Sequence, residues 1–210
     1  MAAYIALQNA KRSLAHAERL ETHRRQRKHT ALRAMLPLAL SQIVEYADQT
    51  AQFLNALVAK CERETLPFGI LKDHVLKPLP SETLKSLADF MEYSDVVNIN
   101  VIASTVALIQ IHDSRLRGMV RDNQDPSNSH IILQRNIERS IVHAASIYAG
   151  ASSGFNYARR LHDHLPGELE LPWDDVARAL QNMGFRDDGH PRLFEIVTHD
   201  KTRSLGPFQR

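Results

Sequence analysis

The chain has 210 residues, of which 43% are hydrophobic and 24% are charged, and this composition excludes wholesale disorder and allows one large core. It holds only 8 glycines and 9 prolines, too few for the many turns of a β-protein, so an all-α fold is expected. The single cysteine, Cys61, excludes an intrachain disulfide and fits a reducing, cytoplasmic location.

The charge is distributed unevenly along the chain, although the formal net charge is only +2. Residues 1–36 carry eight basic and two acidic side chains, so this segment has a charge of +6 and the remainder has −4. Such asymmetry predicts a basic arm that meets the acidic body of a protein partner, an acidic membrane surface or a nucleic acid.

Residues 1–36 contain no proline and no glycine, and they predict one extended, basic N-terminal helix. Leu7 and Leu14 are the large members of an apolar stripe with near-heptad spacing, which favours interaction with a protein partner or with a second copy of the chain as a homo-oligomer. The stripe fades between residues 22 and 29, where the sequence has no apolar residue and carries a basic run of Arg24, Arg25, Arg27 and Lys28. It resumes at Ala31, Leu32 and Met35. The basic run is expected to be a solvated helix face or to meet acidic lipid. Nucleic acid is the least favoured partner, because no aromatic residue is interleaved.

The segment from residue 37 to residue 185 predicts an irregular helical bundle. Pro37 is expected to kink the first helix or to begin a new one, because proline lacks an amide hydrogen and clashes with the preceding turn. Apolar residues then recur at helical spacing as far as Cys61, and a proline-rich loop leads to Ser81, the expected N-cap of a short helix.

Residues 96–111 are apolar on nearly every side, which is typical of a helix that is buried all round or spans a membrane. The run has 16 residues and contains five polar side chains, whereas a span needs about 20 predominantly apolar residues. We therefore expect a central helix of the bundle that ends near Gly118.

Residues 129–165 predict a second long central helix, interrupted at the small residues 150–154, where the helix is broken or another backbone approaches closely. Residues 173–184 predict the last helix. The final residues, 186–210, are expected to form an irregular C-terminal tail with one short strand or helical turn at 193–198.

No catalytic motif rises above chance, and no cofactor or metal site is expected. His162 and His164 form a dense histidine cluster, but residues two apart on a helix point in nearly opposite directions and cannot share one metal ion. Arg159 and His164 have the spacing of the Arg and His pair in helical ribonuclease domains, so a helical nuclease is an alternative function. The same spacing occurs elsewhere in the chain as often as chance predicts.

The first 60 residues resemble the region just after a single transmembrane helix in small uncharacterised bacterial proteins, because an Ala-, Arg- and Glu-rich helix is followed by a Leu-rich segment with a proline. The resemblance implies a body on the cytosolic face of the inner membrane if the true start lies upstream, since positive residues beside a span favour the cytoplasmic side. Ala2 to Leu7 alone are too short to cross a bilayer. The expected function is that of a noncatalytic helical scaffold or sensor module, self-associating or partner-binding, with nucleic-acid binding through the first helix as a further alternative.

Overall fold

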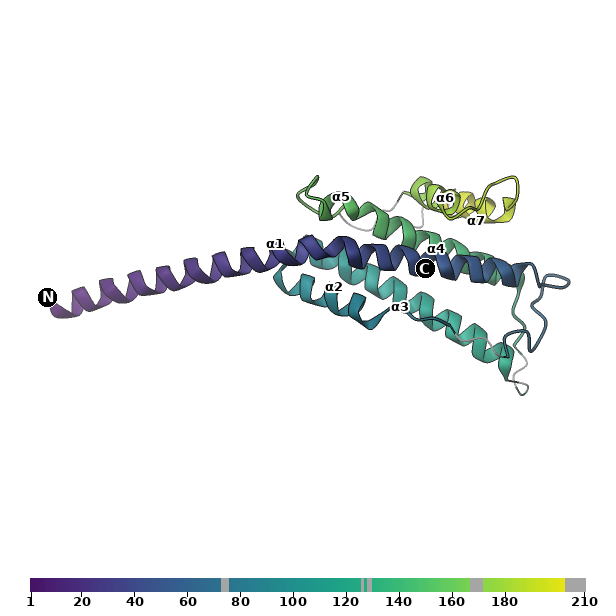
Figure 1. Ribbon diagram of the computed structural model, residues 1–210, viewed down its shortest axis with the longest axis horizontal. Helices are drawn as coiled ribbons and strands as arrows, with labels where there is room; N and C mark the ends of the chain where they lie inside the picture. The colour runs from purple at the N-terminus through teal and green to yellow at the C-terminus, as the bar shows by residue number, and fades with distance from the viewer. Residues whose placement is uncertain (73–75, 126, 128–129, 167–171, 203–210) are drawn as a thin grey trace.

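The computed structural model describes residues 1–72, 76–125, 127, 130–166 and 172–202. The described residues form helices in the order α1 (Ala2–Val58), α2 (Ser81–Tyr93), α3 (Val96–Gln124), α4 (Gln134–Ser153), α5 (Phe155–Ala158), α6 (Trp173–Asn182) and α7 (Pro191–Thr202). The later helices gather around the C-terminal half of α1, while its N-terminal half extends alone (Figure 1). The predicted all-α bundle with a long projecting N-terminal helix is confirmed.

The first helix does not end at Pro37. α1 runs on through this proline to Val58, so no new helix begins there. An internal proline removes one backbone hydrogen bond and costs about 3 kcal/mol. Burial of the neighbouring side chains offsets that cost, because Leu36 and Leu40 are only 2% and 3% exposed.

The contacts of α1 divide it into two parts at residue 29. Every described side chain before His29 is exposed. His29 is the first partly buried residue of α1, and Leu36 is the first fully buried one. We call residues 2–28 the arm and the rest of the described chain the body. At 1.5 Å per residue the arm is about 40 Å long.

Two hydrophobic clusters fill the body, and α1 and α4 contribute to both. The cluster nearer the arm joins α1 to α2, α3 and α5, and the other joins α1 to α6 and α7. α4 lies along α1 and has eleven buried residues, so it is the central helix of the bundle. α1 therefore serves both as the projecting arm and as one wall of each cluster.

The helix predicted to be buried all round is α3, and this expectation is wrong. One stripe of α3 is buried, including Ile102, Ile109 and Leu116, while Val96 and Ile111 are 71% and 46% exposed. α3 also continues past Gly118 to Gln124. By length and composition it is the one helix of the described residues that could cross a membrane, and 28% of its apolar window is buried.

The long helix predicted for residues 129–165 is divided at Gly154, between α4 and α5, and its predicted start at Ser129 lies outside the described residues. A Cβ atom at Gly154 would lie 3.1 Å from Cδ1 of Leu40 in α1. The absence of a side chain at this glycine therefore allows α1 to pack closely against the break.

Two further expectations about the ends of helices need correction. Ser81 is the first residue of α2 and does not cap it through its side chain; Pro80 precedes it. The irregular tail expected from residue 186 is instead helical over α7, where Leu193 and Val197 are buried against α4 and α6. Residues 203–210 lie outside the described part of the chain.

Candidate functional site

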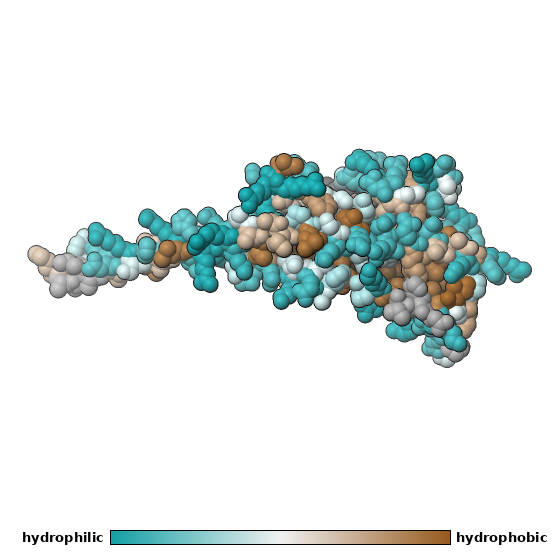
Figure 2. All heavy atoms as spheres, viewed as in Figure 1, coloured by the Kyte–Doolittle hydropathy of each residue, from teal (hydrophilic) through white to brown (hydrophobic). Residues whose placement is uncertain are grey.

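The largest exposed apolar feature of α1 is a stripe along one side of the helix. Its positions follow each other by three and four residues, and we call this set the α1 stripe: Leu7, Ala10, Leu14, Ala17, Glu21, Arg24, Lys28, Ala31, Met35 and Leu38. The large aliphatic members of the stripe are Leu7, Leu14, Met35 and Leu38, with exposed fractions of 55%, 62%, 59% and 58%. Apolar residues gather on α1 where it enters the body, and others follow along the arm (Figure 2).

The continuity of α1 through Pro37 extends the stripe from Met35, in the helix predicted for residues 1–36, to Leu38. Leu7 and Leu14 lie on the arm, whereas Met35 and Leu38 lie on the part of α1 that packs on the body. Leu36, between the last two, is buried in the body and points elsewhere. The next stripe position, Gln42, accepts a hydrogen bond from the hydroxyl of Thr83 in α2, so the free part of the stripe ends at Leu38.

The basic run lies in the last turns of the arm. Arg24, Arg25 and Arg27 are exposed, as predicted for a solvated or partner-binding face. Lys28 is exposed as well, but its Nζ atom lies 5.8 Å from the centre of the Tyr93 ring in α2, a cation–π contact. The first three basic side chains of the run are therefore in solvent, and the last one, Lys28, contacts the body.

A polar junction fixes the direction in which the arm leaves the body. The Arg33 guanidinium donates from Nε and Nη2 to the backbone oxygen of Tyr157, at 2.9 and 2.7 Å, and its Cζ lies 3.9 Å from the centre of the Tyr157 ring. The Tyr157 hydroxyl lies 3.1 Å from Nε2 of His29 and accepts a hydrogen bond from Asn98. Burial lowers the pKa of His29, and Arg33 lowers it further, so the imidazole is neutral at pH 7.

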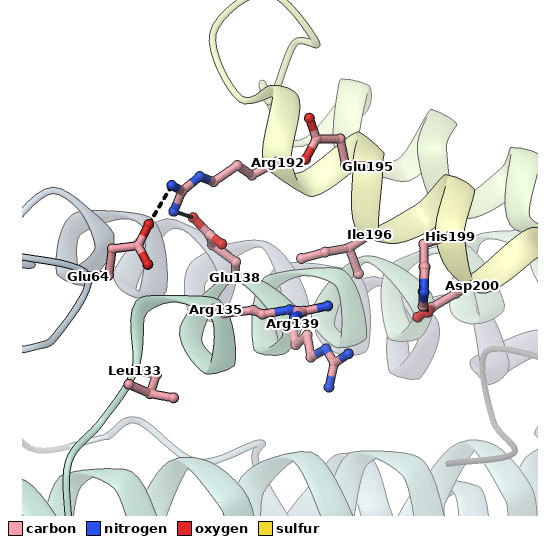
Figure 3. A pocket seen from close by; sticks show the side chains of 10 residues that line it. All are labelled: Glu64, Leu133, Arg135, Glu138, Arg139, Arg192, Glu195, Ile196, His199 and Asp200. Atoms are coloured by element: carbon pink, nitrogen blue, oxygen red, sulfur yellow. Dashed lines mark hydrogen bonds and ion pairs between the residues drawn. The ribbon is translucent and has the colours of Figure 1, made fainter.

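A cavity of about 440 Å³ lies where α4 and α7 meet the turn at Glu64 (Figure 3). Arg192 of α7 donates from Nη2 to Oε1 of Glu64 at 2.7 Å, and its Nη1 lies 3.7 Å from Oε1 of the buried Glu138. Arg135 and Arg139 extend from α4 toward the same space. Four carboxylates line this cavity with the three arginines, so its charges largely compensate one another and tie α7 to α4.

The structure gives Arg159 and His164 separate partners. The Arg159 guanidinium lies 5.4 Å from the centre of the Phe155 ring, and Nδ1 of His164 lies 3.7 Å from Oδ2 of Asp95. Neither residue lines the cavity beside Arg192. Within the described part of the chain, no three His, Cys, Asp or Glu side chains are grouped so that they could hold a metal ion.

Comparison of the chain with protein-family models, with curated proteins and with solved structures gives no match. Its function has to be inferred from the arrangement of its own residues.

Proposed function

We propose that this chain is a noncatalytic helical scaffold module that associates through the α1 stripe with a second copy of itself or with another protein. The observation that carries the proposal is the exposure of Leu7, Leu14, Met35 and Leu38 along one side of a single helix. Apolar residues at alternating spacings of three and four, here at both ends of the stripe, are typical of the seam of a coiled coil. Packing a second helix on it would remove these side chains from water, at about 25 cal/mol per Å² of buried apolar area.

The arm itself supports the same conclusion. Helices in proteins owe most of their stability to packing of an amphipathic face, yet no described side chain of the arm is buried. Hydrogen bonds from side chain to side chain or backbone within the arm are local, such as the one that Gln8 donates to the Tyr4 hydroxyl. A partner on the stripe would supply the packing that the body does not.

We expect the double substitution Leu7→Glu with Leu14→Glu to weaken association by at least about a hundredfold, because it places two charges in the apolar seam. Sedimentation velocity over a concentration series measures this change. Both positions lie in the arm, so at concentrations where both proteins are monomeric the thermal unfolding of the body should be the same in the variant and in the wild type.

The matched control is Asn9→Glu with His16→Glu. These residues have the same seven-residue spacing, are exposed on the opposite side of the arm and receive the same added charge. The control should sediment like the wild type. Equal sedimentation of all three proteins as monomers, together with the absence of any complex with another protein, would refute the proposed function.

The basic run supports an acidic membrane surface as a second partner. Arg24, Arg25, Arg27 and Lys28 are all exposed on the arm, and each basic residue near an anionic surface contributes about 1 kcal/mol to binding. Flotation with vesicles that contain phosphatidylserine, at low and high salt, distinguishes this partner from a protein. Binding that is lost in high salt and in Arg24→Gln with Arg25→Gln would support it, whereas binding to neutral vesicles of equal strength would not.

A further inference from the structure

The partner and its direction can be deduced from the order of residues along the α1 stripe. The stripe is apolar at both ends and charged in the middle, where Glu21, Arg24 and Lys28 occupy successive positions. All three side chains are exposed in the single chain. Any coiled coil on this stripe must therefore place these charges opposite something that compensates them.

We infer that two copies of this chain pair through α1 in an antiparallel coiled coil with Leu7 of each opposite Leu38 of the other. This inference rests on the proposed function and specifies the partner, its direction and its register. In this register the opposed residues are Leu7 with Leu38, Ala10 with Met35, Leu14 with Ala31, Ala17 with Lys28, and Glu21 with Arg24.

Charge is the first reason for the antiparallel direction. Two-fold symmetry creates the Glu21–Arg24 pair twice at the centre, each time between opposite charges. A parallel dimer in register would instead place Glu21 against Glu21 and Arg24 against Arg24. Like charges at seam positions repel, so the parallel arrangement is disfavoured.

Size is the second reason for this register. Ala10 lies opposite Met35 and Leu14 lies opposite Ala31, so in these two layers a large side chain meets a small one. In the layer next to the central charges, the aliphatic stem of Lys28 would cover Ala17 while its ammonium group stays beside the Tyr93 ring of α2. The parallel arrangement would leave alanine against alanine at three positions of the stripe, Ala10, Ala17 and Ala31.

The extent of the free stripe is the third reason. The hydrogen bond between Gln42 and Thr83 closes the stripe beyond Leu38, and Leu7 is its first large described side chain. Pairing these two residues uses the whole free stripe, four and a half heptads over about 47 Å. Each body then lies beyond the centre of the seam on its own side, so the two bodies do not compete for the same space.

Disulfide trapping tests the direction and the register. The variant Ala10→Cys with Met35→Cys is prepared together with both single variants, all carrying Cys61→Ser so that the introduced thiols are the only ones. Within one chain, residues 10 and 35 are about 38 Å apart along the helix, too far for a disulfide. On mild oxidation the double variant should form a covalent dimer, and the single variants should stay uncrosslinked.

Each other outcome contradicts a different statement. Efficient crosslinking of Ala10→Cys alone would show a parallel pair, which overturns the antiparallel inference and leaves self-association standing. A dimer by sedimentation that never crosslinks in the double variant would overturn the register. A chain that is monomeric in every preparation would overturn the proposed self-association itself.

Charge exchange gives a second measurement in the wild-type background. Glu21→Arg and Arg24→Glu should each weaken the dimer by about tenfold or more, and the double exchange should return its affinity to within about threefold of the wild type. Restoration is specific to the antiparallel pair, because a parallel dimer would keep like charges opposed in the double exchange. Both residues are exposed on the arm, so these substitutions should leave the fold of the body unchanged.

Discussion

At the scale of single residues, the histidine in the core, His112 of α3, is the most unusual group in the body. It is 1% exposed, neither ring nitrogen has a hydrogen-bond partner in the described structure, and its ring packs edge-on against Tyr46. Burial, together with the nearby His143 and Arg115, lowers the pKa of His112 to about 3. The folded protein therefore holds this imidazole neutral, whereas the unfolded chain binds a proton on it below about pH 6.5.

This residue should make the body sensitive to acid. Because the pKa is lower in the folded state, stability is fully present above pH 6.5 and is lost as the pH falls from 6.5 toward 3. From pH 7 to pH 4.5 the free energy of unfolding should fall by up to about 2.5 kcal/mol through His112. Urea unfolding at the two pH values measures the loss, and His112→Leu should show a smaller one. Equal losses in the two proteins would mean that His112 is not held neutral.

At the scale of elements, the Arg33 junction ties three segments that are far apart in the sequence. Arg33→Met keeps an aliphatic stem but removes the hydrogen bonds to the Tyr157 carbonyl and the contact with its ring. The free energy of unfolding should fall by about 1–3 kcal/mol. Chemical unfolding measures the change against Arg19→Met, an exposed position of the arm where no loss is expected. Similar stability of the two variants would refute the role of this junction.

The sequence predicts most helices, and its failures have identifiable physical causes. Periodic apolar spacing correctly places α2 and α6, because each has one buried face. It places α4 as well, but as part of a longer helix, and α4 is buried on most of its sides. Of the two outcomes expected at Pro37, the start of a new helix is wrong, because a local rule about proline does not include the burial of Leu36 and Leu40 beside it. The prediction that α3 is buried on all sides is wrong because apolar composition alone does not show which side of a helix packs against its neighbours.

The candidate site could be predicted only in part. Leu7, Leu14 and the basic run are exposed on α1, where the sequence places them. The sequence predicts that the stripe resumes at Met35, but the kink or new helix expected at Pro37 hides its continuation to Leu38. The sequence does not predict the ion pairs of Arg192 with Glu64 and Glu138, because these residues are distant in the chain and only the fold of α7 brings them together.

At the scale of the whole molecule, the arm and the body should be separable. No described side chain of the arm is buried, so deleting residues 1–28 should change the free energy of unfolding of the monomeric body by less than about 1 kcal/mol. The midpoint of thermal unfolding should rise with protein concentration for the full chain and be independent of it for the truncated chain. A truncated chain that fails to fold, or whose midpoint still rises with concentration, would contradict this division.

Because α1 is one unbroken helix from Ala2 to Val58, it also fixes the direction in which the side chains of the arm point relative to the body. With no loop between arm and body, rotation about the helix axis at the tip is set by rotation at the core, at about 100° per residue. A partner bound to the stripe therefore has a fixed orientation relative to α2, α3 and α7. In a dimer, the rotation of one body relative to the other about the helix axis would be fixed as well. Inserting a single residue into the arm would rotate the bound partner about the helix axis by about 100° relative to the body, while every contact within the body stays the same.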